Sequence, residues 1–156
     1  MAKFKMQELL SNESVTARLG VGSGSANYVT DAEIGKPVKL VGDSQYDLCA
    51  VGNQIEAFIT AVESATLDDF SIGSVDAEGR KRVTLDGLQA TPGTGVIAVG
   101  DYVVCGTPVA KGTALTAPPK VCKATTQTGM YFAWRVVSLE GTTAVGQYAT
   151  IERVNG

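Results

Sequence analysis

The stretch from Val99 to Glu140 constrains the fold more than any other part of the chain. It contains three runs of β-branched and aromatic residues, at Tyr102 to Cys105, Lys120 to Ala124 and Tyr131 to Leu139. Segments rich in Gly, Pro and Thr separate these runs, and this alternation is typical of strands joined by turns. We therefore expect a β core here, with the following scaffold residues: Tyr102, Val103, Val121, Trp134 and Val136.

Composition extends this expectation to the whole chain. The 156 residues correspond to one ordinary domain, and 18 of them are glycine while only 19% are charged. This balance favours short strands and tight turns over helical bundles. We expect an all-β fold: a single compact β-barrel or β-sandwich of short antiparallel strands, with an N-terminal arm or short helix.

Two segments before the core stretch also carry strand signals. Residues Ile55 to Ser64 contain Ala and Glu, as a helix would, but apolar residues alternate along them, which favours a strand. Phe70 to Val75 and Arg80 to Leu85 flank a polar break that ends in Gly79. This pattern predicts a β-hairpin.

The N-terminal part differs from the rest of the chain. We interpret residues 1–27 as an arm followed by a Gly/Ser-rich linker, and residues 28–156 as the β domain. A helix as short as this arm is marginal in water by itself, so it needs a surface to pack on. That surface is either its own domain or a neighbouring subunit, and the expected contact residues are Lys3, Phe4, Met6, Leu9 and Leu10.

A weak internal repeat links residues 34–85 with residues 99–154. The segment that begins at Gly35 resembles the one that begins at Gly100, Asp47 to Ala50 resembles Lys120 to Lys123, and the segment from Phe58 resembles the one from Trp134, in the same order. Duplication would explain this similarity, and so would chance similarity between hairpins built from few residue types. We keep the two-fold repeat as a hypothesis.

The sequence offers no catalytic machinery. There is no histidine, which removes Ser-His-Asp and Cys-His schemes. Cys49, Cys105 and Cys122 have no metal-ligand spacing and each lies in an apolar run, so we expect buried, reduced thiols, with a Cys105–Cys122 disulfide as the alternative. We expect a protein that is not an enzyme, with no catalytic residue, no cofactor and no metal.

Charge and hydropathy narrow the range of partners. The net charge is −3, whereas nucleic-acid binding requires clustered Lys and Arg. No apolar run approaches the roughly 20 residues of a membrane span, and the first residues lack the apolar core of a secretory signal. We expect no nucleic-acid and no membrane partner, and a protein that is made and used in a cytoplasm.

Three strand-like segments in the C-terminal part of the chain share a pattern with a known family. Gly100, Asp101 and Val103 form a "GD-x-V" strand, and two later strands match through Val121, Lys123, Ala124, Ala149, Ile151 and Val154. In these positions the chain resembles small bacteriophage capsid decoration, or cement, proteins. Trp134 and Arg135 stand where the family pattern has a small residue or glycine at the start of a strand. The resemblance implies a structural virion protein on the capsid surface, bound to the major capsid protein as a homo-oligomer, either a dimer or a trimer.

If the Val99 to Glu140 stretch is scaffold, the arm and the polar loops are the expected contacts with the capsid. The predicted loop contacts are Gln89, Thr91, Thr94, Thr116 and Pro118. The alternative function is a carbohydrate- or receptor-binding module of a phage head fibre or tail, in which Trp134 or Tyr102 stacks on the ligand. An exposed aromatic ring would favour the alternative.

Overall fold

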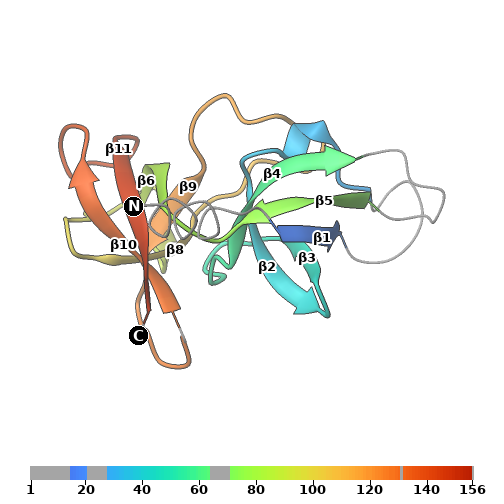
Figure 1. The fold of residues 1–156 in the computed structure, drawn as a ribbon. Helices are drawn as coiled ribbons and strands as arrows, with labels where there is room; N and C mark the ends of the chain where they lie inside the picture. Colours follow the sequence, from blue (N-terminus) through green and yellow to red (C-terminus); the bar gives the residue numbers. More distant parts are fainter. Residues whose placement is uncertain (1–14, 21–27, 64–70, 131, 156) are drawn as a thin grey trace, which may run out of the picture.

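The computed structural model describes residues 15–20, 28–63, 71–130 and 132–155. Apart from one short 3-10 turn, η2 (Asp31–Glu33), every named element in this part of the chain is a strand (Figure 1). The expectation of an all-β fold is confirmed. None of the described helical segments is long and apolar enough to cross a membrane.

Five strands of the first half form a closed barrel. They are β1 (Val15–Leu19), β2 (Pro37–Gly42), β3 (Gln45–Leu48), β4 (Ala57–Glu63) and β5 (Ser71–Asp76). Around the barrel they follow the order β1-β3-β2-β4-β5, and β5 pairs with β1 to close the ring. All neighbours are antiparallel except β1 and β3, which are parallel.

The second half repeats this arrangement. Its strands are β6 (Arg80–Leu88), β7 (Thr91–Pro92), β8 (Tyr102–Cys105), β9 (Lys120–Lys123), β10 (Phe132–Leu139) and β11 (Tyr148–Asn155). The sheet order is β11-β10-β8-β9-β6-β7, and the further pairing of β11 with β6 closes a ring of five strands that leaves β7 outside. Here again one pair, β6 with β9, is parallel.

The two barrels also agree in register. β4 carries a bulge between Ile59 and Ala61, and β10 carries one between Val136 and Ser138. Ile59 is the last residue paired with β5 before its bulge, and Val136 is the last residue paired with β11 before the equivalent bulge. The segments of the sequence repeat lie on the equivalent strands β2 and β8, β3 and β9, and β4 and β10.

A glycine before β2 and one before β8 have the same conformation and donate to equivalent residues of the two barrels. Gly35 has φ +86° and Gly100 has φ +92°, a region that favours glycine. The Gly35 N–H donates to Ile59 O and the Gly100 N–H donates to Val136 O, both at 2.8 Å. The two barrels are therefore equivalent in topology, register and local hydrogen bonding.

Two expectations about strand pairing are wrong. β5 and β6 do not form a hairpin, because β5 pairs with β1 and β4, whereas β6 pairs with β7, β9 and β11. The polar break at residues 77–79 instead crosses from one barrel to the other, so that Val75 and Val83 are buried in different cores. The strands are also not all antiparallel, because closing each five-stranded ring makes one pair parallel.

β1 lies where we expected the end of the arm and the start of the linker. Ala17 and Leu19 are buried in the first barrel, while Val15, Thr16 and Arg18 are exposed. This alternation over five residues is a strand signal that the neighbouring glycines and serines obscured.

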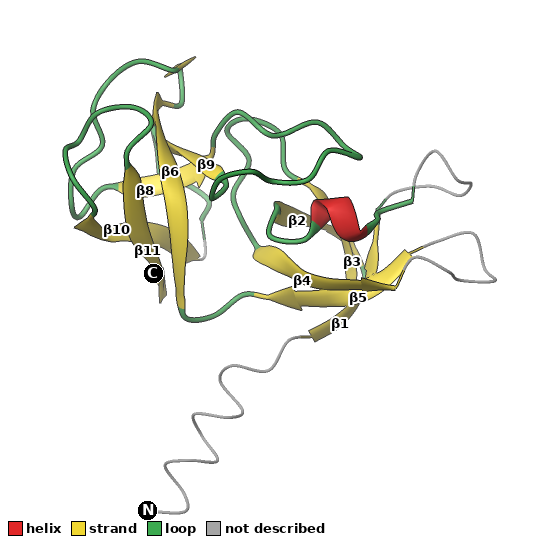
Figure 2. Ribbon diagram, turned by 90° about the horizontal axis from the view of Figure 1, so that it is seen from above, coloured by secondary structure: helices red, strands yellow, loops and turns green. Residues whose placement is uncertain are grey.

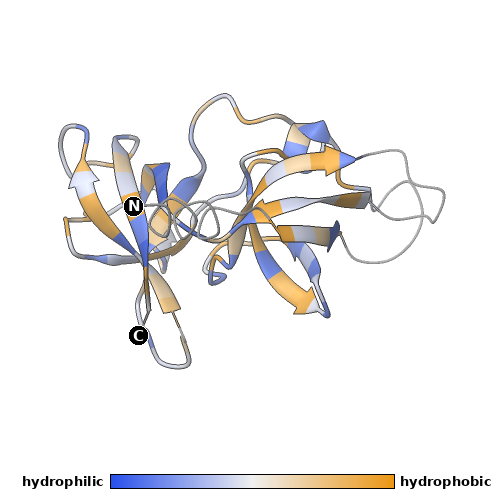
Figure 3. Cartoon of the chain, viewed as in Figure 1, coloured by the Kyte–Doolittle hydropathy of each residue, from blue (hydrophilic) through white to orange (hydrophobic). Residues whose placement is uncertain are grey.

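The two cores meet at a joint between the barrels. The core of the second barrel includes Cys49, Ile55 and Phe58 from the first half of the chain. The ring of Phe58 lies edge-on to that of Trp134, with centroids 5.3 Å apart. Apolar and polar segments alternate along the strands of both barrels (Figure 3). The burial of Cys49, Ile55 and Phe58 in the second core fixes one barrel against the other.

Candidate functional site

Two long connections of the second barrel form the most distinctive surface of the molecule. Residues 89–101 join β6 to β8 and include β7, and residues 106–119 join β8 to β9. The second connection reaches over the first barrel to η2 (Figure 2). Both contain residues that the sequence predicted as contacts.

A buried ion pair holds residues 106–119 against the first barrel. Glu33 is completely buried, and its Oε1 accepts a hydrogen bond from Gly112 N at 2.5 Å and lies 3.4 Å from Lys36 Nζ. Lys36 Nζ also donates to Ala110 O at 2.9 Å. On the other side, Glu33 Oε2 accepts from the N–H and the hydroxyl of Thr30, at 2.7 and 2.9 Å. Every oxygen of the carboxylate is therefore bound. The bond from Gly112 to Glu33, together with the bond from Lys36 to Ala110, ties the loop down.

These contacts determine the charge state of Glu33. Burial alone would raise the pKa of the carboxyl, but the hydrogen bonds from Thr30 and Gly112 and the charge of Lys36 hold that pKa below its ordinary value. Glu33 is therefore ionised at neutral pH. The Thr30-x-x-Glu33 spacing is a capping-box pattern, which is the sequence signal that could have revealed this group.

A second buried carboxylate holds the start of the same loop. Asp86 Oδ2 accepts a hydrogen bond from Thr107 N at 2.7 Å, and Asp86 Oδ1 lies 3.6 Å from Lys120 Nζ. A Cβ on Gly106 would lie 2.9 Å from the carbonyl carbon of Lys120 and 3.0 Å from Asp86 Oδ2, so this position accepts only glycine without movement. The loop is thus fixed at its first residues and again near its middle.

The three cysteines are free and buried. A hydrogen bond with Cys105, together with burial, raises the pKa of the Cys49 thiol far above its ordinary value. Burial and the Asp86 carboxylate raise the pKa of Cys122 to about 12. These two thiols stay protonated at neutral pH and are poor nucleophiles.

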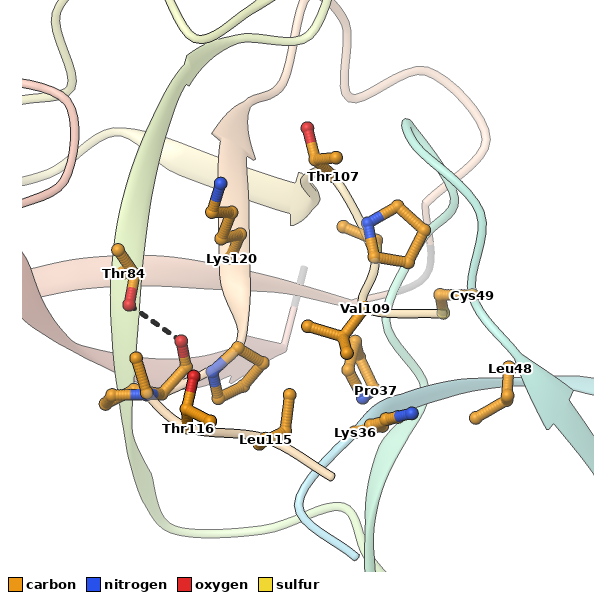
Figure 4. Close-up of a pocket in the computed structure, with 15 residues that line it drawn as sticks. Lys36, Pro37, Leu48, Cys49, Thr84, Thr107, Val109, Leu115, Thr116 and Lys120 are labelled. Carbon is orange, nitrogen blue, oxygen red and sulfur yellow. Dashed lines mark hydrogen bonds between the residues drawn. The ribbon is translucent and has the colours of Figure 1, made fainter. Parts of the chain in front are cut away.

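A mainly apolar cleft lies under the 106–119 connection. Its volume is about 150 Å³, and its lining comes from both barrels and from the connection itself (Figure 4). Thr116 and Pro118, two of the predicted contact residues, line it, and Thr84 Oγ1 donates to Pro118 O at 2.7 Å. Thr116 is exposed and Pro118 is half-buried.

The other connection presents apolar side chains to solvent. We call residues Leu88 to Val99 the 88–99 loop. Ile97 is fully buried in the second core, whereas Val96 and Val99 are 56% and 57% exposed and Leu88 is 36% exposed. The polar residues of this loop were predicted as contacts and these valines were not, although three apolar residues within four positions are a signal that the sequence contains.

Backbone hydrogen bonds hold the 88–99 loop in one shape. Leu88 N donates to Thr94 O at 2.8 Å, and Gly93 N donates to Asp86 O at 2.7 Å. At the far end Ala98 N donates to Asp101 Oδ2 at 2.8 Å. Together with buried Ile97, these bonds order the loop before any partner binds.

The predicted loop contacts are divided between the 88–99 loop and the cleft. Thr91 and Thr94 are exposed and are joined by a hydrogen bond from Thr94 Oγ1 to Thr91 O of 2.9 Å. Gln89 is half-buried, and its Oε1 accepts from the N–H and the hydroxyl of Thr125, both at 3.1 Å. Thr91 and Thr94 therefore lie in contact, Gln89 is bound to Thr125, and Thr116 and Pro118 lie at the cleft.

The remaining predicted residues fall into two groups. The arm residues Lys3, Phe4, Met6, Leu9 and Leu10 lie outside the described part of the chain. Among the scaffold residues Val103, Val121, Trp134 and Val136 are buried and Tyr102 is half-buried.

No cluster of three or more metal-ligating side chains occurs within residues 15–20, 28–63, 71–130 and 132–155. Comparison with known proteins gives no match for the chain among family models, curated proteins or solved structures.

Proposed function

We propose that this chain is a structural virion protein that binds the outer surface of a phage capsid and stabilises the head as a decoration protein. Its partner in this proposal is the major capsid protein. The sequence resemblance to capsid decoration proteins motivates the proposal.

The observation that carries the proposal is the 88–99 loop. Val96 and Val99 are more than half exposed on a loop that is already fixed by hydrogen bonds and by buried Ile97. Exposed apolar side chains on an ordered loop can bind a protein surface at low entropic cost, because little conformational freedom is lost on binding. The polar Thr91 and Thr94 beside them supply hydrogen-bonding groups for the rim of an interface.

The rigid joint between the barrels also supports this role. A protein that bridges positions on a shell transmits force between its contacts, so its own halves must not separate easily. Glu33 and Lys36 lock the 106–119 connection onto the first barrel, and Phe58 packs on Trp134 across the joint. The contacts of Glu33 and Lys36 are buried and join groups of the same chain, so they hold its two halves together.

The alternative of ligand stacking on Trp134 receives no support from its position. The indole ring is 1% exposed and its Nε1 is hydrogen-bonded within the chain. A stacking platform needs an open ring face. Tyr102, the other ring named for this alternative, is half-buried on β8 and so is not a fully open stacking face either.

A co-sedimentation assay with undecorated heads tests the proposal. The double variant Val96→Asp, Val99→Asp places two charges on the loop surface, and we expect it to lower the affinity for heads by at least about tenfold relative to the unmodified protein. Val145→Asp is the matched control, because Val145 is an exposed valine of the same barrel outside this loop.

Unchanged binding by the double variant would contradict the role of the loop. Failure of the unmodified protein to bind heads at all would contradict the proposed function itself. Far-ultraviolet circular dichroism on all three proteins shows whether the fold is retained.

A further inference from the structure

The first barrel covers an open strand edge of the second. Gly52 N donates to Cys105 O at 2.8 Å, and Cys105 N donates to Asn53 O at 2.9 Å. The turn before β4 thus lies beside the end of β8 and satisfies both backbone groups of Cys105. This is strand addition by a short segment of the neighbouring barrel.

The register explains why Cys105 needs this partner. Cys105 pairs with Val121 of β9, and Gly106 N donates to Lys120 O at 2.9 Å. In an antiparallel ladder that bond makes Cys105 and Val121 a non-hydrogen-bonded pair, so the N–H and C=O of Cys105 point away from β9. Without the turn from the first barrel they would face an open edge.

The first barrel has the equivalent edge at Leu40. Leu40 pairs with Tyr46 of β3, as Cys105 pairs with Val121. Cys49 N donates to the first carbonyl of β2, and non-hydrogen-bonded pairs recur at every second position of an antiparallel ladder. By this alternation Leu40 and Tyr46 also form a non-hydrogen-bonded pair, so the N–H and C=O of Leu40 point away from β3. On that side β4 pairs only with the first two residues of β2, and no segment of the described chain is hydrogen-bonded to Leu40 there.

Exposed apolar side chains mark this edge. Leu40 is 52% exposed and Val41 is 43% exposed. Cys105, the counterpart of Leu40, is 1% exposed because the turn covers it. A strand edge with exposed apolar residues is a template for pairing with another chain.

The second barrel carries the matching turn. Gly129 has φ +83° and Gly52 has φ +80°. Met130 N donates to Gln127 O at 3.1 Å, and Asn53 N donates to the carbonyl three residues before it at the same distance. The turn that binds Cys105 in the first barrel therefore has a structural copy at residues 127–130, and this copy leads into β10 as the original leads into β4.

We propose that a second copy of this chain docks through these two surfaces. The turn at residues 127–130 of one copy pairs with the Leu40 edge of the next, which repeats between chains the contact that joins the barrels within one chain. Such an interface is head-to-tail, so it leads to a ring where the rotation closes and to a filament where it does not. The proposal does not depend on capsid binding.

The contact between chains is weaker than the contact within one. Ala57 of the first barrel occupies the position of Trp134, and Arg135 occupies that of Phe58. The aromatic pair that anchors the internal joint is therefore absent from the new interface. We therefore expect the chains to associate with a Kd of about 1 μM or weaker.

Sedimentation velocity with two variants tests the geometry. Leu40→Lys places a charge on the edge, and Met130→Lys places one on the turn. Each variant alone has lost one half of every interface, so each is expected to sediment as a monomer at concentrations where the unmodified protein forms larger species. An equimolar mixture of the two variants restores one intact interface and is expected to form a heterodimer and nothing larger.

The mixture also controls for folding, because only folded chains can complement each other. Val145→Lys, on an exposed valine outside both surfaces, is expected to associate like the unmodified protein. The proposal is overturned if the unmodified protein stays monomeric up to about millimolar concentration, if either variant associates normally, or if the mixture contains only monomers.

Discussion

The indole Nε1 of Trp134 donates a hydrogen bond of 3.1 Å to the carbonyl oxygen of Ile55, and both groups are buried. Trp134 belongs to β10 of the second barrel, whereas Ile55 precedes β4 of the first. One side chain therefore fills the second core and also satisfies a backbone group of the other barrel. The only tryptophan of the chain acts as a structural joint.

Replacing Trp134 with Phe tests this joint. The variant leaves the Ile55 carbonyl without its partner and reduces the packed volume, so we expect the free energy of unfolding to fall by about 2 to 4 kcal/mol. Urea denaturation followed by circular dichroism measures the change. Val99→Ala, at an exposed position, is expected to change it by less than about 0.5 kcal/mol. An equally small effect of Trp134→Phe would show that the joint does not depend on this ring.

The buried carboxylate of Glu33 gives the protein a specific dependence on pH. Its pKa is lower in the folded protein than in the unfolded chain, so its contribution to stability is present above the unfolded pKa and is lost as the pH falls through the folded value. We expect Glu33→Gln to lower stability at pH 7 and to flatten the loss of stability in acid. Thermal unfolding from pH 2 to 7 measures this. Glu63→Gln, at an exposed position, is the control, and parallel pH profiles for Glu33→Gln and the unmodified protein would contradict the assignment.

Glu56 should behave in the opposite way. Burial raises the pKa of its carboxyl, although the charge of Arg153 partly offsets this. The charged form is therefore disfavoured in the folded protein, and the resulting penalty is present above the folded pKa and relieved as the pH falls. We expect Glu56→Gln to leave stability at pH 7 unchanged or slightly higher. A loss of more than about 1 kcal/mol at pH 7 would instead assign Glu56 a stabilising ion pair with Arg153.

The shape of the 88–99 loop depends on Gly87. Gly87 and Gly93 have φ values of +83° and +86°, so alanine causes similar backbone strain at both. A Cβ at Gly87 would also overlap the backbone of Thr94, whereas one at Gly93 meets nothing within 4 Å. We expect Gly93→Ala to cost about 1 kcal/mol and Gly87→Ala clearly more, with faster amide exchange in the loop. Equal costs at the two positions would show that the loop adapts easily.

The local sequence pattern predicted where strands lie better than it predicted which strands pair with each other. The alternation at Ile55 to Ser64 correctly favoured a strand, which the structure shows as β4 (Ala57–Glu63). The hairpin predicted between Phe70 and Leu85 was wrong, because a polar break with a terminal glycine is compatible with a turn and equally with a crossing between barrels. Pairing depends on contacts distant in sequence, which local propensity does not encode.

The candidate site was only partly predictable for a related reason. Gln89, Thr91 and Thr94 were selected because they lie in a polar loop, and in the structure Thr91 and Thr94 are exposed while Gln89 is half-buried. The valines beside them were not selected, since exposure of an apolar side chain depends on which neighbour, here Ile97, enters the core. The Leu40 edge could be recognised only by comparing the two barrels in register.

Cryo-electron microscopy of undecorated phage heads incubated with this protein tests the central claim most directly. The proposal predicts added density at one set of symmetry-equivalent positions on the outer surface, with the 88–99 loop against the shell and with the density lost for the Val96→Asp, Val99→Asp variant. Heads that stay bare at saturating concentrations of the unmodified protein would contradict the proposed function.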